Sequence, residues 1–175
     1  EAMAGLDWIH ELPGQKVLLR GNHDLWWCRI QHLRTLYDDM HFLQNDCYYV
    51  EALDLAICGS RGWPTPDAAT YTEHDEKMYL REQGRLRNSL VEAKKKGASR
   101  IIMAMHYPPA KMEETEFTRI MQEYGVMQCV YGHLHGMVAW TNGIKGEHGG
   151  IDYKLVSLDY LSAKPKLIYD SEQEM

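Results

Sequence analysis

The chain has 175 residues, a length that suits a single domain, and its 45% hydrophobic and 25% charged residues argue against disorder. Its formal net charge of −6 is a poor electrostatic match for nucleic acid or an anionic membrane, because both attract basic surfaces. The longest uninterrupted apolar run covers residues 101–105, which is far too short to cross a bilayer.

Four helices are predicted from apolar periodicity and capping residues. Asp24 is a favourable N-cap, and Thr72 and Asp75 have the spacing of a capping box in a long helix that ends at Gly97. In chain order the predicted helices cover residues 1–12, a segment beginning at Asp24, residues 72–96 and residues 115–124.

Short apolar runs bounded by turn-forming residues predict the strands. In chain order these cover residues 16–20, 47–50, 53–58, 100–105, 126–131, 152–159 and 166–169. Segments 59–69 and 137–150 are rich in glycine or proline and are expected to form loops. Strands that alternate with helices indicate an α/β protein with a largely parallel central sheet.

The four cysteines show no CxxC spacing, and a chain of this length and apolar content does not need disulfides. We therefore expect reduced thiols and a cytoplasmic protein. We expect neither a nucleic-acid nor a membrane partner, and the sequence does not indicate the oligomeric state.

Three predicted strands run directly into polar loops that contain histidine, namely GNHD at 21–24, HYPP at 106–109 and GHLHG at 132–136. Ligands of α/β sheets bind beyond the carboxyl ends of the strands, so we expect these loops to converge. His133 and His135 are two positions apart, and extended backbone would direct both side chains to one side. Each loop taken alone is better explained as a polar strand end.

The first of these loops is the most informative. The amide oxygen of Asn22 is a neutral ligand for a hard cation, and His23 beside it is free to act on a substrate. Asp24 could both cap the following helix and hold His23 in one tautomer. A polar turn between a strand and a helix is the simpler explanation when this loop is considered alone.

Taken together, the ordered segments G-N-H-D, H-Y-P-P and G-H-L-H-G resemble the calcineurin-like metallophosphoesterases. The segments LDWIHELPGQKVLLRGNHDLWW, GSRGW, MHYPPA, VYGHLHG and KLVSLDYL are most similar to a bacterial and archaeal subgroup of predicted phosphohydrolases. The resemblance covers nearly the whole chain. It implies an α/β fold in which two sheets form a sandwich flanked by helices.

The resemblance also implies a site for two divalent transition-metal ions (Mn, Fe, Zn or Ni) that hydrolyses phosphate monoesters or diesters. The implied metal ligands are Asn22, His106 and His133 for one ion and His135 for the other. His23 would contact the scissile phosphate and help to protonate the leaving oxygen, with Asp24 orienting it. Arg61 is a further candidate for contact with phosphate, because guanidinium matches phosphate geometry.

Two of the family's motifs, D-x-H and G-D-x-x, do not occur before Asn22. In the family they supply the remaining ligands, among them an aspartate that bridges both ions. The chain also begins inside a helix without a capping residue, so we expect a partial domain over residues 1–175 that lacks its first strand-helix-strand unit. Such a chain would carry the C-terminal ligand set, bind at most one ion weakly, and have impaired activity.

Two other functions remain open. A non-catalytic metal-binding or interaction domain would retain the fold without the first motifs. A nuclease of the same superfamily is disfavoured by the acidic charge balance. The substrate, the choice between monoester and diester, and the metal are not determined by the sequence.

Overall fold

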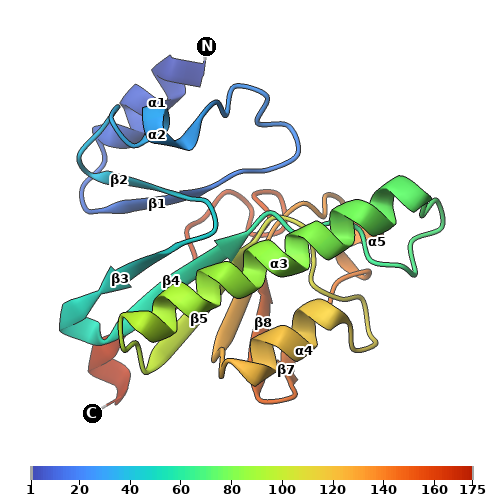
Figure 1. Cartoon of the computed structure of the whole chain (residues 1–175). Helices are drawn as coiled ribbons and strands as arrows, with labels where there is room; N and C mark the ends of the chain where they lie inside the picture. Colours follow the sequence, from blue (N-terminus) through green and yellow to red (C-terminus); the bar gives the residue numbers. More distant parts are fainter. Residues whose placement is uncertain (1, 175) are drawn as a thin grey trace.

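Two β-sheets and the helices that flank them make up the protein, in a computed structural model that describes residues 2–174 (Figure 1). One sheet has six strands and the other has two. The predicted α/β class with two sheets is therefore confirmed.

The large sheet has four mutually parallel central strands and an antiparallel strand at each edge. In sheet order its strands are β3 (Cys47–Val50), β4 (Leu55–Ser60), β5 (Arg100–Met105), β6 (Gln128–Tyr131), β8 (Ile151–Leu155) and β7 (Gly146–His148). Ile101 and Met103 of β5 are fully buried, as expected for a central strand covered on both faces. The carboxyl ends of the parallel strands point the same way, so the loops that follow them are neighbours.

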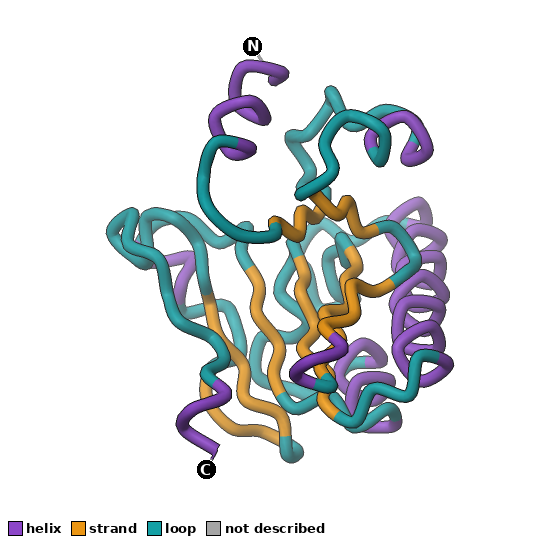
Figure 2. Tube along the Cα trace, turned by 90° about the vertical axis from the view of Figure 1, so that its left-hand side faces the viewer, coloured by secondary structure: helices purple, strands orange, loops and turns teal. Residues whose placement is uncertain are grey.

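Two helices lie side by side on one face of the large sheet (Figures 1 and 2). They are α3 (Glu73–Lys95) and α4 (Glu116–Glu123). Leu86 of α3 and Phe117 of α4 are fully buried in the main core. The predicted capping box is confirmed, because the Asp75 N–H donates to the Thr72 hydroxyl and the Thr72 N–H donates to the Asp75 carboxylate.

The small sheet consists of two parallel strands, and two short helices complete this part of the fold. Its elements are α1 (Ala2–His10), β1 (Lys16–Leu19), α2 (Ile30–Leu33) and β2 (Met40–Leu43). A second apolar cluster joins them, with Leu6, Trp27 and Phe42 among its buried members. Strand β2 was not among the predicted strands, because four residues between two turns carry too little periodicity.

Gly59 allows the two sheets to approach each other. A Cβ atom at this position would lie 2.7 Å from Cδ1 of Leu43 and 3.1 Å from Cδ1 of Leu19. Strand β4, which contains Gly59, extends to Ser60 rather than ending at the predicted residue 58.

The helix predicted to begin at Asp24 does not begin there. The Asp24 carboxylate accepts hydrogen bonds from the Gly21 N–H (2.6 Å) and the Trp26 Nε1–H (3.1 Å), so it closes a turn instead of capping a helix. Helix α2 begins only at Ile30, with Arg29 in the N-cap position.

Three predictions for the last third of the chain are wrong. Residues 166–169 form no strand, and β8 ends at Leu155 rather than at residue 159. The segment 137–150, predicted as a loop, contains α5 (Met137–Trp140) and β7. For the strands the reason is that a strand needs a partner, and β7 exists because it pairs with β8, which local sequence does not show.

Candidate metal centre

Three polar side chains from three separate strand ends meet at one point. Asn22 follows β1, His106 follows β5, and His133 follows β6. The Nε2 atom of His106 lies 2.6 Å from Oδ1 of Asn22 and 3.1 Å from Nδ1 of His133. The expected convergence of the three loops is therefore present, and it joins the small sheet to the large one.

These separations suit ligands of a single cation. Neighbouring ligands of a divalent ion with bonds of about 2.1 Å lie roughly 3 Å apart. The two separations in the structure, 2.6 and 3.1 Å, are close to that value. An amide oxygen and two imidazole nitrogens are ligands that Mn, Fe, Zn and Ni all accept, so the residues present fit such an ion.

Both imidazoles of this cluster are held in the neutral form at neutral pH. Burial lowers the pKa of His106 to about 4, and the charge of His133 contributes in the same direction. Burial also lowers the pKa of His133, with added effects from the charges of His135 and His23. Because a metal binds the neutral imidazole, the cluster can accept an ion without first losing protons.

Gly21 leaves room for the His106 ring. A Cβ atom at position 21 would lie 3.1 Å from Cε1 and Nδ1 of His106 and 3.2 Å from Oδ2 of Asp24. Both carboxylate oxygens of Asp24 are engaged within its own loop, and in the described residues Asp24 forms no hydrogen bond to His23. Asp24 thus fixes the turn that presents Asn22, and the orienting role expected for it is not seen.

His23 lies beside the cluster with its side chain exposed. Its charge contributes to the lowered pKa values of both His106 and His133, which places it within electrostatic range of them. Over residues 2–174 its ring makes no hydrogen bond, so the ring is available to a bound molecule.

His135 lies apart from the three-residue cluster. Its Nδ1 atom is 3.0 Å from Oδ1 of Asp159, and its side chain is 67% exposed. The expectation that His133 and His135 point to one side assumed extended backbone, but His133 has a φ of 67°. That left-handed conformation breaks the alternation of side chains.

Asp159 was missed by sequence reasoning, although it follows β8 just as the other candidates follow their strands. The Gly136 N–H donates to its Oδ2 atom at 2.8 Å, and this bond and the contact with His135 lower the pKa of its carboxyl group. Asp159 therefore supplies a carboxylate next to His135.

Arg61 and two aromatic rings form a wall beside the cluster. The guanidinium of Arg61 lies 4.6 Å from the centroid of the Trp63 ring. The backbone carbonyl of Arg61 accepts a hydrogen bond from the Tyr107 N–H at 2.9 Å. The Tyr107 ring contacts His133, with centroids 4.2 Å apart. Tyr107 was not predicted to take part, and its position directly after His106 was the available signal.

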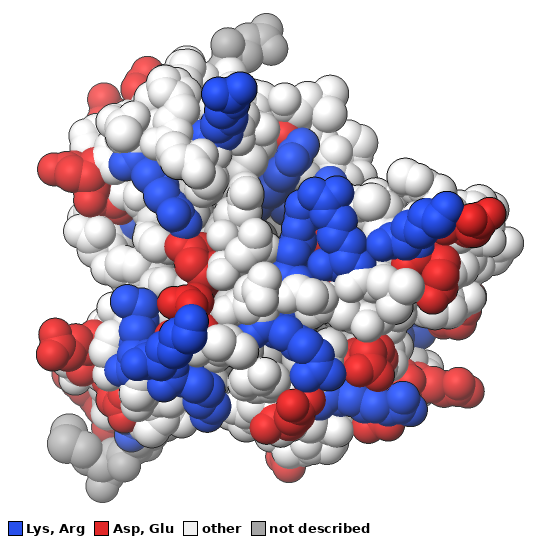
Figure 3. Space-filling model, viewed as in Figure 1, with Lys and Arg blue, Asp and Glu red and all other residues white. Residues whose placement is uncertain are grey.

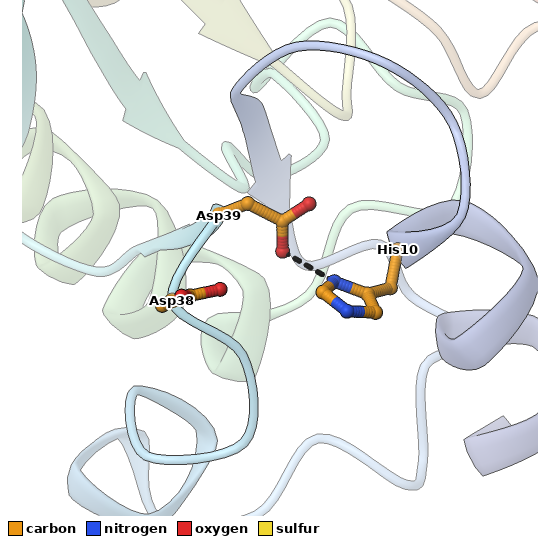
Figure 4. A group of neighbouring side chains, drawn as sticks. All are labelled: His10, Asp38 and Asp39. Atoms are coloured by element: carbon orange, nitrogen blue, oxygen red, sulfur yellow. Dashed lines mark hydrogen bonds and ion pairs between the residues drawn. The ribbon is translucent and has the colours of Figure 1, made fainter.

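A second group of possible metal ligands, His10, Asp38 and Asp39, lies beside the small sheet (Figure 4). The Nδ1 atom of His10 is 2.6 Å from Oδ1 of Asp39, and the Lys16 ammonium also pairs with Asp39. The lysine already neutralises this carboxylate, so an internal ion pair accounts for the group. The parallel pairing of β1 with β2 brings these residues together, and that pairing was not predicted.

The fold and the cluster define an α/β protein with donor atoms for a metal at its strand ends. The chain belongs to the calcineurin-like phosphoesterase family, whose model matches residues 4–137. The family acts on phosphoesters with divalent metal ions, as the resemblance implied. Comparisons with curated proteins and with solved structures give no match. None of the helices in residues 2–174 combines the length and the apolar character of a membrane-spanning segment.

Proposed function

We propose that this protein hydrolyses phosphate monoesters or diesters at a two-metal site. The observation that carries the proposal is the convergence of Asn22, His106 and His133 from three loops in a member of this family. These three residues hold one ion, and His135 binds the second. The four free cysteines support a reducing, cytoplasmic location.

Each nearby side chain has a defined role in this proposal. When bound, the ions polarise the phosphoryl oxygens and activate the attacking water. His23 donates a proton to the leaving oxygen, a step for which histidine is the most frequent donor. Asp24 holds the turn in place, and the guanidinium of Arg61 stabilises the charge of the phosphate.

Metal binding at this site is expected to be weak. Asn22, His106 and His133 are all neutral, so they do not compensate the charge of a divalent ion. Among residues 2–174 no carboxylate or thiol joins the two histidines in a group whose ligand atoms lie within 4.8 Å of one another. Mn, Fe, Zn and Ni therefore remain alternatives, and the activity of this chain is expected to be impaired.

The experiment is a hydrolysis assay with p-nitrophenyl phosphate and bis-p-nitrophenyl phosphate, with and without Mn²⁺. We expect metal-dependent release of nitrophenol that falls at least roughly 100-fold in His133→Gln. Arg87→Gln is the matched control, because Arg87 pairs with Glu116 and Glu123 on the helical face. Hydrolysis that is insensitive to metal or to His133→Gln would refute the proposal.

The alternative, a non-catalytic metal-binding domain, predicts a different pattern in the same samples. Mn²⁺ would bind and His133→Gln would abolish that binding, but neither ester would be hydrolysed.

A further inference from the structure

An arginine-lined cavity of about 440 Å³ lies between the small sheet and α3. Five arginines line it, namely Arg20, Arg29, Arg61, Arg81 and Arg85. Figure 3 shows Lys and Arg side chains gathered on this face of the molecule, where the small sheet meets α3. Glu82 is the one acidic residue among the described residues of the lining.

Glu82 does not neutralise this group of arginines. Its carboxylate is fully buried, with Oε1 accepting from Nη1 of Arg85 at 2.5 Å and Oε2 accepting from the Ser60 hydroxyl at 2.9 Å. Within residues 2–174 none of the other four arginines forms an ion pair with a carboxylate. The cavity is therefore strongly positive, although the whole chain carries a net charge of −6.

Two of the arginines also have unsatisfied donors. The Nε atoms of Arg20 and Arg61 are shielded from solvent and have no hydrogen-bond partner in the described part of the chain. Buried donors are normally paired, so these N–H groups are available to an acceptor on a bound molecule. Guanidinium groups match the oxygens of phosphate in planar, bidentate geometry.

The cavity and the metal centre share a wall. Arg61 lines the cavity, and its carbonyl accepts from the N–H of Tyr107, the residue directly after His106. The charge of Arg61 also contributes to the lowered pKa of His106. Arg61 thus links the arginine cavity to the residue that follows His106.

We propose that the arginine cavity binds a second phosphate group of the substrate. This inference rests on the proposed function and narrows it to small molecules that carry two phosphate groups. A cavity of this volume suits one such group and part of its carrier. A nucleic acid would need a longer basic track, and the acidic chain does not favour one.

The experiment measures binding of inorganic pyrophosphate by calorimetry to protein stripped of metal on a chelating resin. Removal of metal excludes any contribution of the metal centre. Arg29 and Arg81 are exposed, so Arg29→Gln and Arg81→Gln are expected to fold. We expect each to weaken pyrophosphate binding at least about tenfold, and Arg87→Gln on α3 to leave it unchanged.

Two results would overturn the inference: no binding of pyrophosphate by the unmodified protein, or equal binding by Arg29→Gln and Arg81→Gln. A single-stranded oligonucleotide that binds more tightly than pyrophosphate and depends on the same arginines would also overturn it.

The variant His133→Gln separates this test from that of the proposed function. Loss of hydrolysis with retained pyrophosphate binding in that variant is expected. Absence of hydrolysis from the unmodified protein with arginine-dependent binding intact would refute the proposed function, and the cavity would then be a phosphate-binding site that does not serve hydrolysis.

Discussion

The Nε2 atom of His106 lies 2.6 Å from the amide oxygen of Asn22, although 84 positions separate the two residues. Asn22 belongs to the loop after β1 in the small sheet, and His106 follows β5 in the large sheet. The contact therefore depends on the packing of one sheet against the other. His133 completes the cluster from the neighbouring strand, 3.1 Å from the same nitrogen of His106.

Asn22→Asp is expected to raise the affinity for Mn²⁺ about tenfold. The substitution exchanges a neutral oxygen ligand for a carboxylate of the same shape, which compensates the charge of the ion. Calorimetric titration with Mn²⁺ measures the change. Asn88→Asp, on the exposed face of α3, adds the same charge elsewhere and is expected to have no effect. Equal affinities in Asn22→Asp and the unmodified protein would contradict the assignment of Asn22 as a ligand.

Stability is expected to fall as the pH is lowered from about 6.5 to about 4. The pKa of His106 in the folded protein is about 4, below the ordinary value of 6.5, so the unfolded chain binds more protons across this range. The contribution of neutral His106 to the free energy of unfolding is fully present above pH 6.5 and is lost as the pH falls towards 4. We expect a loss of roughly 1–2 kcal/mol, because solvent screens a half-buried group.

Urea unfolding of metal-free protein at several pH values measures this loss. His106→Gln removes the titrating group, so its stability is expected to vary less with pH across the same range. A profile that is identical in the two proteins would show that His106 is not the group responsible.

Asp24→Ala is expected to weaken Mn²⁺ binding about tenfold without removing a ligand. Asp24 accepts from the Gly21 N–H and the Trp26 indole, so its loss frees the turn that presents Asn22. The loss of these bonds is also expected to cost about 1–3 kcal/mol of stability. Asp38→Ala, at an exposed site, is the control. An unaltered Mn²⁺ affinity in Asp24→Ala would mean that Asp24 does not position Asn22.

Gly59→Ala is expected to destabilise the protein by about 1–3 kcal/mol. Its Cβ atom would lie 2.7 Å from Cδ1 of Leu43, which is buried and cannot easily move away. Gly84→Ala, on α3 where a Cβ atom meets nothing within 4 Å, is expected to stabilise by about 0.5–1 kcal/mol. Thermal melting compares the two variants, and a shift of the same sign in both would contradict this account of the sheet interface.

Features set by neighbouring residues were predictable from the sequence. The boundaries of α3 followed from Thr72, Asp75 and Gly97, because a capping box and a terminating glycine act within one turn of the helix. The meeting of Asn22, His106 and His133 was also anticipated, since each directly follows a strand with a recognisable apolar pattern.

Features set by distant pairing or by backbone conformation were not predictable in the same way. Strands β2 and β7 depend on partners that local periodicity does not reveal. The left-handed conformation of His133 redirects the chain, so His135 meets Asp159 rather than the other histidines. The five arginines of the cavity come from four separate segments, and among them only Arg61 is a candidate that the sequence predicts.

The most direct test of the metal centre is the Mn²⁺ content of the protein after loading and brief desalting, measured by elemental analysis. The account predicts that the unmodified protein keeps about one ion per chain at the cluster through desalting, since His135 alone holds the second ion too weakly to retain it. Almost no Mn²⁺ is expected in His133→Ala and Asn22→Ala. His10→Ala, at the ion-paired group beside the small sheet, is expected to retain the ion. No bound Mn²⁺ in the unmodified protein, or equal Mn²⁺ in His133→Ala, would contradict the claim that Asn22, His106 and His133 hold a metal.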